Sequence, residues 1–181
     1  GAAKDLPKWL RQKPADIPSQ EVASFVGAKK ETLDLLHQAA SLSSWGQDMD
    51  PVKPAYAWPI PDMSSYMSLA DLLYHSAVVK TDAGDGSGAL KDLSVIESMS
   101  NHLRMGSSLM SAILSITLDK KRVQGLEYLL SHLPDRTPMQ ISPVKAHGTA
   151  LDMAQRALRS ENLVMSDGLY YAVVKGWDDA P

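Results

Sequence analysis

The chain has 181 residues, a formal net charge of −3 and no cysteine. This length suits a single domain with its own hydrophobic core, and the charge lacks the basic excess of a typical nucleic-acid-binding protein. Without cysteine there are no disulfides, thiolate nucleophiles, iron–sulfur clusters or cysteine zinc sites. No apolar run approaches the ~20 residues that span a bilayer, so we expect no integral membrane segment.

The N-terminal region is expected to be an arm followed by a helix. Prolines interrupt residues 1–18, which limits this arm to a short helix at most. Ser19 is a favourable N-cap, because its hydroxyl can accept from the first free backbone N–H groups of a helix. A helix is therefore predicted from Ser19 to about Ser44, with a bend at Gly27.

Residues 45–65 are predicted to form a loop that is rich in proline and aromatic residues. Closely spaced prolines exclude a helix, and a loop of about twenty residues is long for a compact domain. The segment is either a strap whose rings pack on the helices or a binding loop. Aromatic side chains give large contact area at small entropic cost. The candidate binding residues are Trp45, Tyr56, Trp58 and Tyr66.

Apolar residues then recur three and four apart, which predicts helices at about 65–83, 88–104 and 107–133. Within the last of these, Leu109 to Leu118 is interpreted as buried core, and Asp119 is a candidate internal cap at which the helix could break.

The C-terminal third of the chain continues the helical pattern. Residues 134–143 form a second proline-rich loop, a helix is expected from about Ser142 to Ser160, and a short final helix is preferred for residues 163–177. The sequence therefore predicts one all-α domain over 1–181, irregular and with about six or seven helices.

The two helices at 65–83 and 88–104 resemble a tetratricopeptide helix pair over about one repeat. The residues that carry the resemblance are Leu73, Ala77, Gly84, Asp85, Ala89 and Leu93. It implies small residues at the helix crossing, a Gly84 turn with left-handed backbone, and Leu93 facing Leu73 and Ala77. The chain departs from the family pattern at Ser76, Lys80 and Asn101. No second copy follows at a 34-residue offset, so a solenoid of at least three stacked units is not expected.

Residues able to do chemistry are sparse. Asp71 and His75 are four apart and share a helix face, but a lone pair of this kind is more typical of a surface contact than of a metal site. The glycine-rich turn at 82–88 lacks the ligands of a calcium loop and the lysine of a phosphate loop. Ser142 and Lys145 match the spacing of serine–lysine enzymes, whose other motifs are missing. We expect no cofactor, no metal and no readable catalytic residue.

The leading functional hypothesis is a non-enzymatic helical module that binds a protein or peptide. A first alternative is an enzyme or small-ligand-binding protein whose residues meet only in three dimensions, such as Asp71, His75 and His102. A second is an envelope-associated structural subunit. Because the chain begins at Gly1 without a methionine, we expect the native N-terminus to be missing. A soluble protein of the cytoplasm or periplasm is expected, and its oligomeric state stays open.

Overall fold

The computed structural model describes three continuous stretches of the chain, one residue before them and a few residues near the C-terminus. They are residue 7, residues 19–42, 62–105 and 108–132, and residues 152, 155, 157–159, 161–162 and 165–166. The predicted arm at 1–18, most of the 45–65 loop, the 134–143 loop and most of the expected C-terminal helices lie outside them. No described residue lies in a strand, five helices can be delimited, and the described residues between 152 and 166 are also helical, which confirms the all-α prediction. The helices are α1 (Ser19–Ala28), α2 (Lys30–Ala40), α3 (Met63–Asp82), α4 (Gly86–Met105) and α5 (Leu109–His132).

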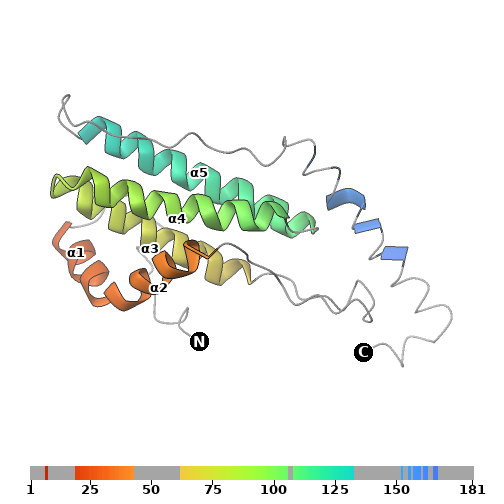
Figure 1. Ribbon diagram of the computed structural model, residues 1–181, viewed down its shortest axis with the longest axis horizontal. Helices are drawn as coiled ribbons and strands as arrows, with labels where there is room; N and C mark the ends of the chain where they lie inside the picture. Colours follow the sequence, from red (N-terminus) through yellow and green to blue (C-terminus); the bar gives the residue numbers. More distant parts are fainter. Residues whose placement is uncertain are drawn as a thin grey trace.

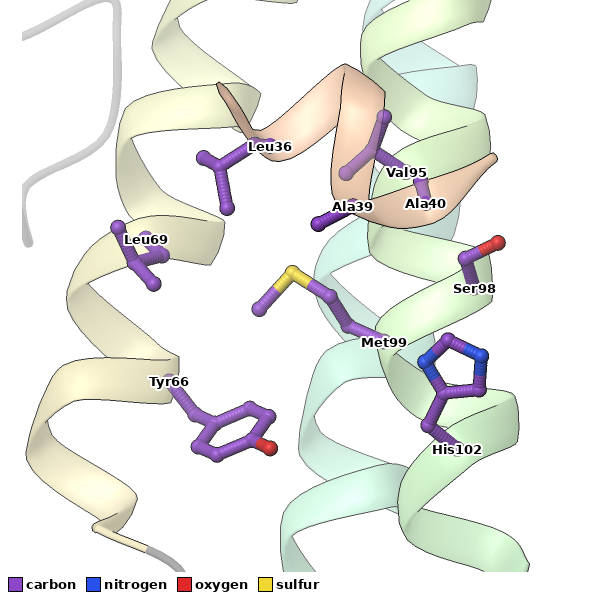
Figure 2. A pocket seen from close by; sticks show the side chains of 9 residues that line it. All are labelled: Leu36, Ala39, Ala40, Tyr66, Leu69, Val95, Ser98, Met99 and His102. Carbon is purple, nitrogen blue, oxygen red and sulfur yellow. The ribbon is translucent and has the colours of Figure 1, made fainter. Parts of the chain in front are cut away.

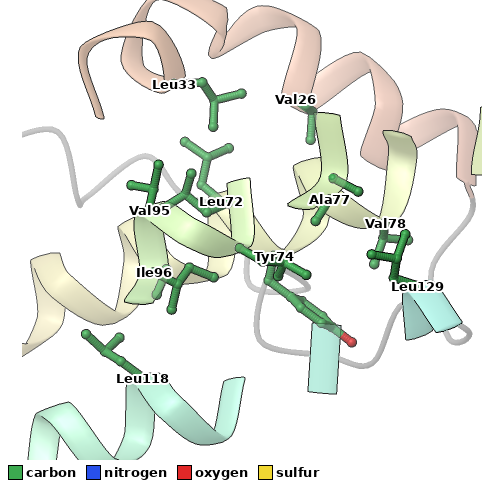
Figure 3. Close-up of a cluster of buried hydrophobic side chains, with 14 of the residues drawn as sticks. Val26, Leu33, Leu72, Tyr74, Ala77, Val78, Val95, Ile96, Leu118 and Leu129 are labelled. Atoms are coloured by element: carbon green, nitrogen blue, oxygen red, sulfur yellow. The ribbon is translucent and has the colours of Figure 1, made fainter. Parts of the chain in front are cut away.

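Three long helices make the body of the protein (Figure 1). Helices α3, α4 and α5 pack against one another, while α1 lies on α3 and α2 lies on α4. Figure 1 shows α1 and α2 on one side of this body and α5 on the other. The core between the helices is aliphatic, with Leu72, Ile96 and Leu118 at its centre (Figure 3). Burial of these side chains is the main stabilising contribution to the fold.

The turn between α3 and α4 caps both helices. Gly84 has a φ of 78°, as the sequence predicts, and its N–H donates to the Thr81 carbonyl at 2.9 Å. The N–H of Asp85 donates to the Lys80 carbonyl at 2.8 Å, which completes a Schellman motif. The Asp85 carboxylate then accepts from the N–H of Gly88 at 2.8 Å and so caps α4.

The structure confirms that the predicted core residues of the hairpin are buried, but it does not confirm the resemblance to the tetratricopeptide family. Ala77, Ala89 and Leu93 are all buried, as expected of a tight helical pair. However, the hairpin runs from Met63 to Met105, which is longer than the 34-residue tetratricopeptide unit. The resemblance to that family is therefore not confirmed.

Two further expectations about helices differ from the structure. The single helix predicted from Ser19 is broken at Lys29, whose N–H donates to the Val26 carbonyl at 3.1 Å in a tight turn. The break lets α1 pack on α3 while α2 packs on α4. Helix α5 continues through Asp119 without a break, because that carboxylate accepts from Ser100 Oγ of α4 at 2.7 Å and pairs with Arg104 rather than capping a helix.

The interpretation of Leu109 to Leu118 as a buried core helix holds for only one side of the helix. Leu114 and Leu118 are fully buried, whereas Leu109, Ile113 and Ile116 are exposed. Only the side of α5 that faces α3 and α4 is covered among the described residues, since a helix buries one stripe when it packs at the edge of a bundle.

Buried carboxylates link the helices. Asp71 of α3 is buried and pairs with Lys121 of α5. Asp92 of α4 is fully buried and binds Lys80 of α3. The sequence alone does not reveal these pairs, because each cation lies 12 or more residues from its carboxylate.

Candidate binding groove

An apolar groove opens where α2 crosses the space between α3 and α4 (Figure 2). Figure 2 shows α3 and α4 as its two walls and α2 across one end. The space measures about 160 Å³. The lining residues come from α2 (Leu36, Ala39, Ala40), α3 (Tyr66, Leu69) and α4 (Val95, Ser98, Met99, His102).

The groove exists because α2 ends in small residues. Ala39 and Ala40 form the last turn of α2 and present only methyl groups to the space between the longer helices. On α4 the lining residues Val95, Met99 and His102 recur four and three apart, so they share one helix face. The Met99 side chain reaches into the middle of the space in Figure 2. A thioether of this kind adapts to ligands of different shape.

The polar groups at the groove are uncharged near neutral pH. Burial raises the pKa of the Tyr66 hydroxyl above its usual value. Burial also lowers the pKa of the His102 imidazole, so the neutral ring dominates at pH 7. Together with Ser98, these side chains can exchange hydrogen bonds at the edge of an apolar surface. This combination suits an apolar ligand that carries a few polar atoms.

An ion-paired carboxylate holds α2 in place beside the groove. His37 of α2 lies with its Nε2 2.7 Å from one oxygen of Asp92. The other oxygen accepts from Lys80 Nζ of α3 at 2.6 Å. Since Asp92 belongs to α4, this single side chain connects the three helices that form the groove. The groove geometry is therefore tied to a buried, hydrogen-bonded charge.

The predicted binding residues are only partly within the described residues. Tyr66 lies in the second turn of α3, half-buried, and lines the groove. Trp45, Tyr56 and Trp58 lie outside the described residues. The structure thus brings one of the four candidates to the groove.

The residues of the enzyme alternative are not brought together. His102 lines the groove, whereas Asp71 and His75 are buried and Asp71 pairs with Lys121 on the α5 side of α3. Asp71 lies about 160° round α3 from Leu69, which faces the groove. The expectation that Asp71 and His75 make a surface contact is therefore wrong. In the described part of the chain, no three His, Asp or Glu side chains converge in a way that could hold a metal ion.

Most of the groove residues carry no signal in the sequence that sets them apart. Leu36, Leu69 and Met99 carry the ordinary pattern of a core-facing helix, and nothing in that pattern shows that a gap remains beside them. The available signal was the pair Ala39–Ala40 shortly before the predicted helix end at about Ser44, since small residues near a helix end leave space beside their neighbours.

Searches of protein-family models, of curated proteins and of solved structures find no match to this chain. None of the described helices is long and apolar enough to cross a membrane.

Proposed function

We propose that this protein is a helical interaction module whose groove accepts one bulky apolar side chain of a partner peptide. The size of the groove carries the proposal. A buried apolar cavity of about 150 Å³ accepts one benzene molecule, whereas sites for drug-sized ligands usually measure about 300–1,000 Å³. A space of about 160 Å³ therefore suits a single aromatic or branched aliphatic side chain.

The edge of the groove supports a peptide as the source of that side chain. Tyr66, Ser98 and His102 offer neutral hydrogen-bonding groups beside the apolar surface, which match the amides that flank an anchor residue. Peptides in helix-lined grooves are commonly held by such buried apolar anchors. Among the described residues, no charged side chain lines the groove, so we expect affinity that depends little on salt.

The test uses amino-acid amides as probes. The protein is labelled with ¹³C in its methionine methyl groups and titrated with N-acetyltryptophanamide, N-acetylleucinamide or N-acetylglycinamide. The Met99 methyl resonance, assigned with Met99→Leu, should shift and saturate with the first two probes and not with the third. Because burial of one apolar side chain contributes about 1.5–3 kcal/mol, half-saturation is expected on the order of 10 mM.

Variants that fill the groove give the decisive comparison. Ala40→Leu, and independently Ala39→Leu, add a branched side chain to the α2 end of the space and should abolish the Met99 shift. Ala23→Leu makes the same chemical change at an exposed site on α1 and should leave it intact. An undiminished Met99 shift in both folded α2 variants, or shifts confined to residues outside the groove, would refute the proposal.

A further inference from the structure

Helix α5 carries apolar side chains on two opposite faces. Leu114, Leu118 and Leu129 are fully buried against the bundle. On the other face, Leu109, Ile113, Ile116, Val123 and Leu130 are between 42% and 58% exposed. Of the ten large apolar side chains exposed among the described residues, six belong to α5. Concentration on one helix distinguishes this surface from the isolated exposed apolar residues that any protein has.

The exposed residues are arranged with a seven-residue period. Leu109, Ile116, Val123 and Leu130 follow one another at intervals of seven, and Ile113, Lys120 and Glu127 form a second row four residues later. We call these seven positions the outer stripe. Two rows with a common seven-residue spacing are the pattern by which one helix packs lengthwise along another. The outer stripe therefore suits a helix as its partner rather than a small molecule.

The two charges of the outer stripe identify that helix as a second copy of α5. Lys120 comes three residues before Val123 and Glu127 comes four residues after it. Both side chains are exposed, and neither has an ion-pair partner in the described part of the chain. An antiparallel copy related by a two-fold axis at Val123 places Lys120 beside Glu127 of the partner subunit, and the reverse pair forms by symmetry.

Three of the five apolar residues obey the same symmetry, whereas Leu109 and Ile113 lie beyond the overlap of the two helices because α5 ends at His132. Ile116 and Leu130 each lie seven residues from Val123, so the axis places Ile116 against Leu130 of the partner subunit. Val123 then meets the partner's Val123 at the axis. A parallel copy would instead place Lys120 beside the partner's Lys120 and Glu127 beside the partner's Glu127, and these like charges would repel. Charge and shape thus select the same antiparallel register.

We propose that the part of the outer stripe from Ile116 to Leu130 is the contact surface of an antiparallel homodimer with its two-fold axis at Val123. The helices overlap over about 30 Å, since each residue of a helix rises 1.5 Å. One helix-wide strip of that length buries on the order of 1,000 Å² in total, the lower limit for a specific interface. An interface of this size is expected to associate weakly and reversibly. Because α1 and α2 lie on the other side of the body, the groove stays open in it.

Charge reversal tests the register by sedimentation equilibrium of the full chain. Lys120→Glu and Glu127→Lys each place two pairs of like charges in the interface and should raise the dimer dissociation constant tenfold or more. The double variant Lys120→Glu/Glu127→Lys restores opposite charges and should return the constant to within about threefold of the original value. Circular dichroism confirms folding of each variant. Single and double variants that associate alike would overturn the proposal, as would a chain that is monomeric at millimolar concentration.

Cross-linking gives an independent answer, because the chain has no cysteine of its own. Unlabelled Ile116→Cys protein is mixed with ¹⁵N-labelled Leu130→Cys protein, oxidised and weighed by mass spectrometry. The mixed disulfide should dominate, since a disulfide needs Cα atoms within about 7 Å. Two Ile116 positions would be about 21 Å apart in the proposed dimer. Dominant self-pairing of Ile116→Cys would instead indicate a parallel dimer and refute the proposed register.

Discussion

The closest contact between α4 and α5 predicts the effect of a single added methyl group. A Cβ atom built on Gly125 of α5 would lie 2.4 Å from Cδ2 of Leu93 and 3.3 Å from its Cδ1. Leu93 is only 1% exposed, so its side chain has no free space into which to turn. Overpacking of this kind destabilises a protein by about 1–3 kcal/mol. The higher helix propensity of alanine offsets up to ~1 kcal/mol of this loss. We expect Gly125→Ala to lower the free energy of unfolding by about 1–2 kcal/mol.

Gly27→Ala is the matched control, because it makes the same change in α1 with no atom within 4 Å of the new Cβ. It should leave stability unchanged or raise it by up to ~1 kcal/mol. The measurement is urea unfolding monitored by circular dichroism. The dependence of the free energy of unfolding on urea concentration should be the same in the variants and the original protein. If Gly125→Ala proves as stable as Gly27→Ala, the close packing of Leu93 on Gly125 is refuted.

A double-mutant cycle isolates the same contact. Leu93→Ala alone should cost about 2–5 kcal/mol through lost burial and a residual cavity. In the double variant Leu93→Ala/Gly125→Ala, the new methyl group occupies part of that cavity instead of colliding with Leu93. The double variant should therefore lose at least ~1 kcal/mol less free energy of unfolding than the sum of the losses in the two single variants. Additive effects would show that the two side chains do not touch.

Three further predictions follow from the turn, the buried carboxylate and the groove. Gly84→Val should cost about 1–2 kcal/mol in urea unfolding, because its φ of 78° is strained for a branched residue, while Gly84→Asn should cost less. Asp92→Asn should lower the free energy of unfolding by about 1–3 kcal/mol, because it removes the carboxylate that holds His37 and Lys80. It should also accelerate hydrogen exchange in α2 more than in α5. Equal acceleration in both helices would contradict that role. For His102, NMR titration should give a pKa below 6.5. Because the pKa of His102 is lower in the folded than in the unfolded chain, the unfolded chain takes up the proton first as the pH falls. The neutral His102 ring therefore contributes less to the free energy of unfolding as the pH falls below about 6.5. The decrease in the free energy of unfolding between pH 7 and 5 should be smaller in the His102→Gln variant than in the original protein.

The sequence predicts those parts of the fold that depend on local chemistry. The extents of α3, α4 and α5 follow from apolar spacing, and the Gly84 turn follows from the conformational freedom of glycine. The sequence predicts a bend at Gly27, but the break itself falls two residues later at Lys29, which is not a helix breaker. It depends instead on α1 and α2 packing against different helices.

The groove and the buried charges could not be predicted for a related reason. Asp92 looks like an ordinary exposed acid until α2 and α3 bring His37 and Lys80 to it, and His37 is 55 residues away. Likewise, the gap beside Met99 exists only because α2 ends at Ala40 while α3 and α4 continue. Both features are properties of how helices are placed, and periodicity within a helix carries no information about placement.

The compact turn at Gly84 and Asp85 has a consequence for the order of folding. Its capping hydrogen bonds all lie within nine residues, Lys80 to Gly88, so α3 and α4 can pair at a small entropic cost of loop closure. By contrast, α2 is joined to α3 through a connection of more than twenty residues, and its anchor, Asp92, is on α4. Local contacts form fastest, so the α3–α4 pair is expected to be structured in the transition state and α2 to dock afterwards. Substitution at Gly84 should then slow refolding, whereas substitution at Asp92 should mainly accelerate unfolding.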